Sequence, residues 1–257
     1  MNFNELDAKM RVYETAHDHC VLPGLYMVAR LDGRGFTRLV REVHDFEAPF
    51  DRRFHDFMVE TTRHLMQCGF DVQYGYTESD EISLLFRRDE SSFGRKLRKL
   101  VSVLAGEASG KFSLLLGDLA CFDCRISQLV SDELVIDYFR WRSEDAHRNA
   151  LNAHAYWMLR KEGQTRRAAT AAIEGLSVSD KNELLFARGV NFDTLPAWHK
   201  RGSGVYWEAY DKIGVDPRTG RETIATRRRL RVDEALPRGE AYAEFLRRFL
   251  SSGRAGS

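Results

Sequence analysis

The chain has 257 residues, a formal net charge of +1, 43% hydrophobic residues and 30% charged residues. This balance is typical of a globular protein with a substantial core, and no apolar run approaches the ~20 residues that span a bilayer. The polar segment 1–14 lacks the apolar centre of a signal peptide. We therefore expect a cytoplasmic protein without membrane contact.

The first half of the chain alternates helical periods with short apolar runs. These patterns predict, in chain order, a helix, a strand, a helix, two strands, a helix and a strand, over residues 4–17, 25–32, 51–68, 70–76, 81–87, 94–116 and 119–126. After the first helix the order is β-α-β-β-α-β, the ferredoxin-like unit. We therefore expect an α+β fold whose antiparallel sheet has its first and third strands adjacent at the centre.

The second half of the chain is mainly helical. Its patterns predict one or two helices, a helix capped by Ser179, a hairpin that turns across Pro217 and Gly220, and a closing helix, over residues 132–163, 179–186, 204–232 and 239–250. No linker separates the halves. We expect residues 1–130 to form the catalytic domain and residues 131–257 to form an extension packed on it.

Three acidic residues, Glu78, Asp80 and Glu81, stand at the start of the expected third strand, and Asp32 ends the first. Antiparallel neighbours would bring Asp32 and Asp80 to one edge of the sheet. Like charges this close repel and lose solvation when covered, so the pair predicts a cation. Mg²⁺ prefers such oxygen ligands, and two metal ions between carboxylates serve nucleotidyl transfer. The alternative is an Asp-Gly turn and an acidic hairpin tip that bind nothing.

Basic residues gather in clusters although the net charge is small. Each cluster by itself is typical of a solvated surface, but several together favour a polyanionic partner such as a nucleic acid backbone. The clusters are Arg87–Arg88, residues 95–99, Lys200–Arg201 and residues 227–231.

Cysteine and tryptophan residues have simpler interpretations. Cys121 and Cys124 have the spacing of half a zinc site or of a redox pair, but the chain has no second such pair. We expect two free thiols in a buried strand. The four tryptophans, Trp141, Trp157, Trp198 and Trp207, are expected in the core and not as platforms for stacked bases.

Several segments together resemble the tRNA-His guanylyltransferase family and its bacterial and archaeal Thg1-like relatives. They are VARLDGRGF, YGYTESDEISLLF, FGRKLRK, WRSEDAHRNALN, SDKNELLF and HKRGSGVYW, in the family's order over roughly residues 25–210. The resemblance implies a polymerase palm in residues 1–130 that adds nucleotides to the 5′ end of tRNA. Family members activate a 5′-monophosphate with ATP or GTP, and the 3′-hydroxyl of an incoming NTP then attacks it.

The resemblance also implies roles for single residues. Asp32 and Asp80 would hold two Mg²⁺ ions with help from the Gly33 carbonyl, and Glu81 would support them as a third catalytic residue. The implied nucleotide contacts are Gly33, Arg34, Gly35, Phe36, Thr37, Ser79, Lys96, Lys99, His147, Asn149, Lys181 and Asn182. The basic clusters supply the expected RNA contacts, Lys200, Arg201, Arg227, Arg228 and Arg229.

Two segments depart from the family pattern. Residues 48–51 read Ala-Pro-Phe-Asp where many guanylyltransferases have Lys-Pro-Asn-Asp, and residues 147–153 lack an Asn and a Tyr of the family helix. These departures favour template-directed repair of the 5′ end over untemplated addition of G to tRNA-His. The resemblance also implies a homo-oligomer, a tetramer, and the length of a tRNA compared with one protomer agrees with it.

Two other functions remain as alternatives. A purine nucleotide cyclase on the same palm would also use two metal ions, but it would have no use for the basic clusters. An RNA-binding module on a ferredoxin-like sheet would need exposed aromatic residues on its central strands. The expected strands offer carboxylates and aliphatic residues instead.

Overall fold

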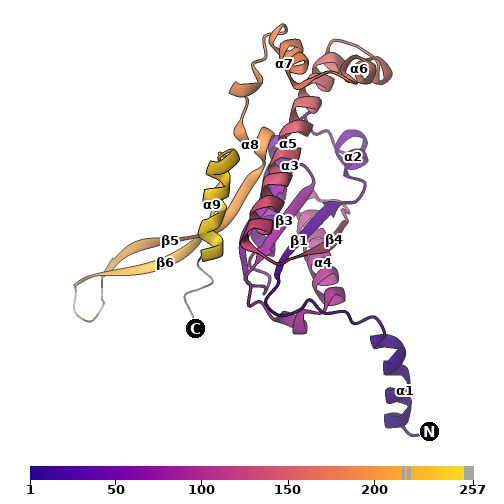
Figure 1. Ribbon diagram of the computed structural model, residues 1–257, viewed down its shortest axis with the longest axis vertical. Helices are drawn as coiled ribbons and strands as arrows, with labels where there is room; N and C mark the ends of the chain where they lie inside the picture. The colour runs from indigo at the N-terminus through magenta and orange to yellow at the C-terminus, as the bar shows by residue number, and fades with distance from the viewer. Residues whose placement is uncertain (216–217, 219–220, 252–257) are drawn as a thin grey trace.

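A computed structural model describes residues 1–215, 218 and 221–251 (Figure 1). Within these residues an antiparallel sheet of six strands has the order β4-β1-β3-β2-β5-β6. The strands are β1 (Tyr26–Gly33), β2 (Val72–Glu78), β3 (Glu81–Phe86), β4 (Phe122–Leu129), β5 (Ser203–Val215) and β6 (Glu222–Asp233).

Helices occupy most of the remaining described chain. They are α1 (Phe3–Thr15), α2 (Phe36–Arg38), which continues as the π-helical turn η1 (Leu39–Val43), α3 (Arg52–Leu65), α4 (Leu97–Leu116), α5 (Asp132–Lys161), α6 (Arg166–Ile173), α7 (Val178–Phe186), α8 (Ala197–Arg201) and α9 (Gly239–Ser251). Two 3₁₀ turns, η2 (Ser92–Arg95) and η3 (Phe192–Thr194), precede α4 and α8.

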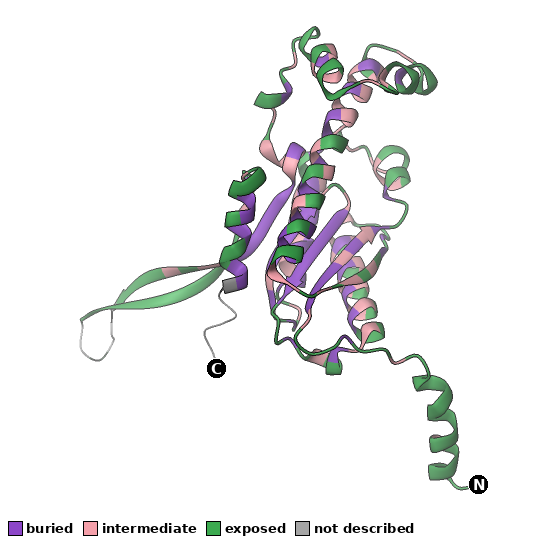
Figure 2. Ribbon diagram, in the orientation of Figure 1, coloured by how far each residue is buried: buried purple, intermediate pink, exposed green. Residues whose placement is uncertain are grey.

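The central strands of the sheet are covered on both faces, as Figure 2 shows by their buried colour. Successive residues of a strand point to opposite faces, so β1 serves two clusters. Met27 and Leu31 pack with Leu104 of α4 and other apolar residues of α3 and α4. Tyr26 and Val28 belong to the second cluster, which includes residues of α5 and α9. This second cluster joins the two halves of the chain.

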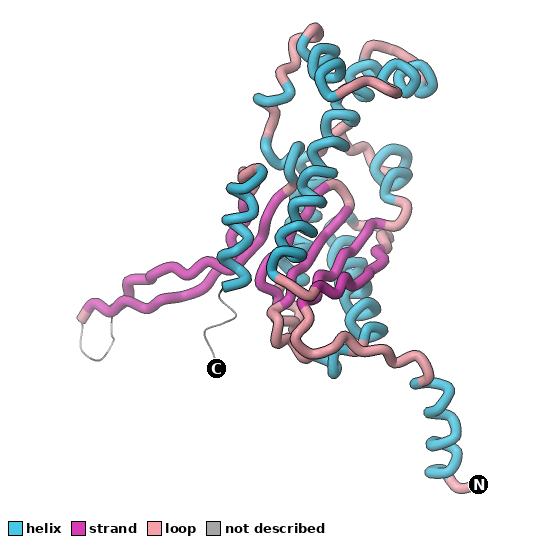
Figure 3. Tube along the Cα trace, in the orientation of Figure 1, coloured by secondary structure: helices cyan, strands magenta, loops and turns pink. Residues whose placement is uncertain are grey.

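The expected β-α-β-β-α-β unit is confirmed, with β1 and β3 adjacent and antiparallel at the centre of the sheet. The expected hairpin is formed by β5 and β6, and β5 continues the sheet by pairing with β2. Figure 3 shows the hairpin as a long arm that reaches away from the sheet. Pro217 and Gly220, which were expected in its turn, lie outside the described residues.

One expected helix start was wrong, and the short helices α2, α6 and α8 were not predicted. The N-cap of α7 is Ser177 and not Ser179, because Ser177 and Asp180 form a reciprocal capping box. Ser179 lies in the first turn instead. The helices α6 and α8 have only 8 and 5 residues, too short for a clear apolar period.

The helix α1 lies apart from the rest of the protomer (Figure 1). It contains no buried residue, and its apolar side chains Phe3, Leu6, Met10 and Tyr13 are exposed at a spacing that places them on one side. No helix within the described parts of the chain combines the length and apolar character that a membrane span requires.

Candidate functional site

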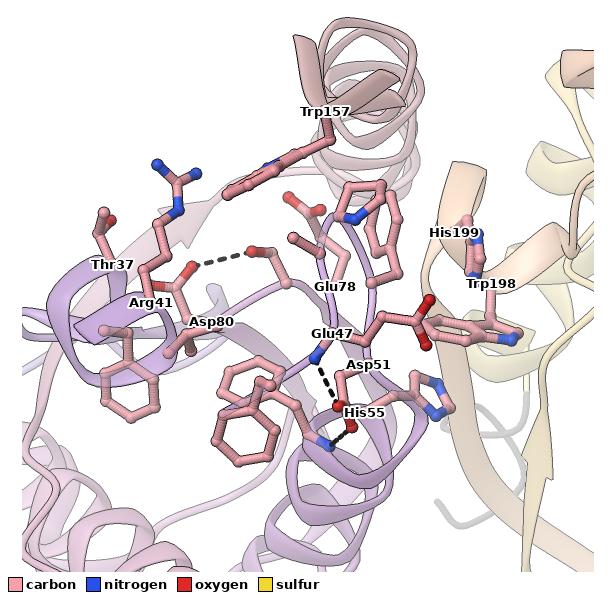
Figure 4. Close-up of a pocket in the computed structure, with 18 of the residues that line it drawn as sticks. Thr37, Arg41, Glu47, Asp51, His55, Glu78, Asp80, Trp157, Trp198 and His199 are labelled. Carbon is pink, nitrogen blue, oxygen red and sulfur yellow. Dashed lines mark hydrogen bonds between the residues drawn. The ribbon is translucent and has the colours of Figure 1, made fainter. Parts of the chain in front are cut away.

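Asp32 and Asp80 meet at one edge of the sheet, namely where the central strand β1 ends and the central strand β3 begins. Asp32 is paired with Glu81 across β1 and β3, and the backbone N–H of Gly33 donates to the Asp80 carbonyl over 3.0 Å. The two-residue turn between β2 and β3 places Asp80 there, with Ser79 in the left-handed region at φ 48°. The Ser79 hydroxyl donates to the Asp80 carboxylate over 3.1 Å (Figure 4).

The electrostatics of this edge favour a bound cation. Burial, and after it the charge of Asp32, raises the pKa of Asp80. Burial and the neighbouring Glu81 raise the pKa of Glu78 to about 8. Both shifts mean that the folded protein holds negative charge here only at a cost. A divalent cation with oxygen ligands would remove that cost, so the donor set fits Mg²⁺.

The loop after β1 is shaped by glycine and by a buried ring. A side chain at Gly33 would overlap the ring of Phe36, which packs 5.0 Å from both Phe112 and Phe122. Gly35 has φ 74°, which L-residues with a Cβ rarely adopt. The Arg34 N–H donates to the Cys121 carbonyl over 2.8 Å and is already used.

A cavity of about 270 Å³ opens beside Asp80. Three of the residues expected to bind nucleotide line it, namely Phe36, Thr37 and Ser79, together with the expected metal ligand Asp80. Its other walls come from regions far along the chain: Trp157 of α5, and Trp198 and His199 of α8 (Figure 4). The cavity therefore lies between the sheet edge and the helices of the second half.

One wall of the cavity is aromatic and uncharged. The rings of Phe50 and His199 stack with centroids 4.5 Å apart, and His199 lies 3.3 Å from His154 between ring nitrogens. Burial lowers the pKa of both histidines to about 4, so they are neutral at pH 7. At the mouth, the Arg41 guanidinium lies 5.3 Å from the Trp157 ring. This combination suits a planar base with phosphates attached.

Glu81 does not face the cavity but forms a buried ion pair with Arg142 of α5. The Arg142 Nε and Nη2 donate to its two carboxylate oxygens over 2.7 and 2.9 Å. Arg142 also lies 3.7 Å from Glu78 and 3.4 Å from Asp145. Sequence reasoning missed this residue, although an arginine on an otherwise aromatic stretch of helix was a usable signal.

The other predicted nucleotide contacts are not gathered at this edge. Lys96 lies at the opposite end of β1, since it bridges to Cys20, and its Nζ is 2.8 Å from Asp18. With ~3.3 Å per strand residue, about 20 Å separates that end from Asp32. Lys99 is one turn further along α4. In one protomer, neither lysine reaches a phosphate held at Asp80.

Four predicted contacts on α5 and α7 also lie outside the cavity. His147 packs against Phe192 with ring centroids 5.3 Å apart, and the Asn149 amide donates to Asp145 over 3.3 Å. Lys181 and Asn182 are on α7, near the end of α5 that projects beyond the sheet (Figure 1).

The predicted RNA contacts differ in exposure. Lys200 is only 3% exposed, and its Nζ donates to the carbonyls of Phe192 and Asp193 over 3.1 and 2.6 Å. Arg201 donates to the Leu236 carbonyl over 2.6 Å. Lys200 therefore holds the chain together, and Arg201 uses its Nε in the same way. In contrast, Arg227, Arg228 and Arg229 are exposed on β6.

Two remaining expectations have clear outcomes. Cys121 and Cys124 are free thiols, as expected, although Cys121 is exposed. Trp141 is exposed, and Trp157 and Trp198 line the cavity, so their expected place in the core was wrong, whereas Trp207 packs against the main core. The described residues also contain a separate group of possible metal ligands, His55, Asp56 and Glu234. Arg52 already pairs with both of its carboxylates over 2.8–2.9 Å.

Known proteins resemble the chain over both halves. A family model described as tRNAHis guanylyltransferase matches residues 7–130, and one described as Thg1 C terminal domain matches residues 133–236. The tRNA(His) guanylyltransferase of Debaryomyces hansenii is 34% identical over 205 residues, 75% of this chain and 77% of that protein. The tRNA(His) guanylyltransferase of Neurospora crassa is 33% identical over 199 residues, 72% of this chain and 68% of that protein.

Solved structures resemble the fold as well. A bacterial tRNA(His) guanylyltransferase (Thg1)-like protein in complex with ATP superimposes with a TM-score of 0.73 at 26% identity, over 95% of this chain and 98% of that one. A structure of a bacterial protein of the same description in complex with GTP gives 0.72 at 25% identity, over 96% and 99%.

Proposed function

Because the chain belongs to the tRNA-His guanylyltransferase family, whose members are 3′-to-5′ nucleotidyltransferases, we propose that it repairs tRNA 5′ ends by template-directed addition of nucleotides. The observation that carries the proposal is the pair Asp32 and Asp80, of which Asp80 lines a cavity of about 270 Å³. The matches to this family over both halves of the chain also favour a nucleotidyltransferase over a cyclase.

Asp32 and Asp80 are the proposed ligands of two Mg²⁺ ions, with the Gly33 carbonyl as a further ligand. Bound there, the ions would neutralise the phosphates and lower the pKa of the attacking hydroxyl. The raised pKa of Asp80 supports this assignment, because a carboxylate that is costly to ionise in the empty site gains most from a cation.

The cavity is the proposed site of the activating ATP or GTP. Its aromatic wall at Phe50 and Trp157 would hold the base, and the hydroxyls of Thr37 and Ser79 would face the phosphates. Arg41 is available to balance phosphate charge at the mouth. The walls from α5 and α8 would exclude water from the reacting phosphate.

The cavity wall at residues 48–51 lacks side chains that could select one base, and this favours selection of the nucleotide by the template. Residues 48 and 50 are Ala and Phe, which offer no side-chain hydrogen bond to a base edge, and Asp51 is occupied in capping α3. Without such contacts, the choice of nucleotide should depend on pairing with the opposing base of the acceptor stem, since a wrong pair leaves hydrogen-bonding groups unsatisfied.

The templating test uses four tRNAs that lack the first 5′ nucleotide and differ only in the opposing base. We expect each tRNA to receive mainly the complementary NTP, which sequencing of the 5′ end and single-NTP extension would both show. Addition of G regardless of the opposing base, or only to tRNA-His, would instead identify a dedicated tRNA-His enzyme.

The exposed Arg227, Arg228 and Arg229 of β6 are proposed to grip the RNA backbone without reading sequence. Arg229 shares the carboxylate of Glu208 with Arg231, at 2.8 Å for each pair, which reduces its free charge. Lys200 is not carried forward as an RNA contact, because its buried Nζ donates within the protein, and Arg201 is not carried forward because its Nε binds the Leu236 carbonyl.

A tetramer is the proposed assembly. The exposed apolar side of α1 and the paired Ile213 and Ile224 of the hairpin, 67% and 70% exposed, support it, because association would cover them. Multi-angle light scattering at micromolar concentration is expected to give four times the protomer mass. A monomer mass under the same conditions would contradict the proposal.

A further inference from the structure

The edge strand β4 and the neighbouring β1 leave part of the α5-side face of the sheet open. Asp32 is paired with Asp123, and Arg30 with Arg125, and directly paired residues share one face. The Asp123 and Arg125 side chains are 57% and 54% exposed. We call these four residues the β1–β4 strip.

Trp141 of α5 stands beside this strip with its ring 54% exposed. The guanidinium carbons of Arg30 and Arg142 lie 5.9 and 4.7 Å from the ring centroid. Arg142 is itself fixed by its two bonds to Glu81. The ring is therefore held at a defined place by two arginines, and its uncovered part is available for stacking.

The strip and the cavity lie on different sides of the carboxylate pair. Asp80 lines the cavity, whereas Asp32 belongs to the strip between Glu81 and Asp123. A reaction at this pair needs a reacting group from each side. The cavity has the size of one nucleotide. The strip lies on an open edge strand and can accept the end of a polymer.

We propose that the β1–β4 strip and Trp141 bind the 5′-terminal nucleotide of the tRNA, with the Trp141 ring stacked on its base. This inference rests on the proposed function and names the site of its RNA substrate. Arg125 supplies positive charge for the phosphates, and because it is exposed it can exchange its 3.2 Å pairing with Asp123 for a phosphate. The Arg30 Nε is buried without a hydrogen-bond partner and lies 3.7 Å from Glu81, so Arg30 adds positive charge beside the ring but is assigned no phosphate contact. Aromatic stacking suits this role because every base offers a ring face, whatever the sequence.

The test places 2-aminopurine at the 5′ end of a truncated tRNA and measures binding without NTP. Stacking on Trp141 should quench the probe when the wild-type protein binds. Trp141→Leu should lose most of the quenching and bind roughly tenfold more weakly, whereas Trp141→Phe should keep most of both. The exposed position of Trp141 makes misfolding of either variant improbable on physical grounds, and melting curves would check it.

A charge variant gives a second readout. Arg125→Gln should weaken RNA binding and reduce the slope of log K against log salt by about 1. Arg148→Gln is the matched control, because Arg148 is an arginine of α5 that is 73% exposed and lies outside the strip. It should change neither quantity.

The outcomes separate this inference from the proposed function. Quenching and affinity that are unchanged in Trp141→Leu would overturn the strip as an RNA site. If Trp141→Leu raised the KM for the NTP and left the KM for RNA unchanged, the inference would also be overturned, because the strip would then bind the free nucleotide. Failure of the wild-type protein to add nucleotides would overturn the proposed function, while the binding assay would still decide on the strip.

Discussion

Replacing Asp32 or Asp80 by alanine is expected to reduce nucleotide addition by at least about 10³-fold while leaving the fold intact. Each change removes a proposed ligand whose metal ion stabilises the transition state by several kcal/mol. The loss should appear in single-turnover rates at saturating NTP and Mg²⁺. The control is Asp137→Ala on the exposed side of α5, which should retain wild-type rates.

Although Asp80→Ala should lower activity, it should not lower stability. Burial raises the pKa of Asp80 in the folded protein, so the ionised carboxylate opposes folding at pH 7. This cost is absent below the unfolded pKa and sets in as pH rises through the folded pKa. Without metal, Asp80→Ala should therefore melt at the same temperature as the wild type or higher. The rise in Tm that Mg²⁺-GTP gives the wild type should be lost. Full activity in either variant would remove the metal assignment.

The second large effect is expected from Arg142→Leu, which should lower the free energy of unfolding by about 3–5 kcal/mol. The change removes the closest counter-charge of Glu81 and Glu78 and leaves Glu81 with the more distant Arg30 at 3.7 Å, while the Glu81 side chain is only 9% exposed. Urea denaturation of the two proteins would measure the difference. Activity should fall as well, because Glu81 is paired with Asp32 across the two central strands.

A double variant separates the ion pair from simple packing. In Arg142→Leu combined with Glu81→Leu no buried Glu81 charge remains, so part of the lost stability should return. The exposed Arg148→Leu on the same helix should stay within about 0.5 kcal/mol of the wild type. The ion pair would not have the assigned role if Arg142→Leu were as stable as this control, or if the double variant gained nothing.

Local sequence determined the sheet and its acidic edge. The apolar runs and helical periods give the order β-α-β-β-α-β, and that order requires β1 and β3 to be antiparallel neighbours. Asp32 at the end of one strand and Asp80 before the other must then meet. The prediction needed no side-chain packing, since connectivity alone fixes which strand ends adjoin.

Tertiary structure decided which other side chains reach that edge. Glu81 follows Asp80 directly, but its role depends on Arg142, which lies 61 positions away on a helix whose docking angle no local pattern gives. The basic segment around Lys96 reads as a phosphate site, yet α4 begins at the far end of β1. The wall of Trp157, Trp198 and His199 exists only after α5 and α8 pack beside the loop at Phe50. Periodicity identifies the buried side of each helix, whereas the contacts between distant helices depend on how whole surfaces fit together.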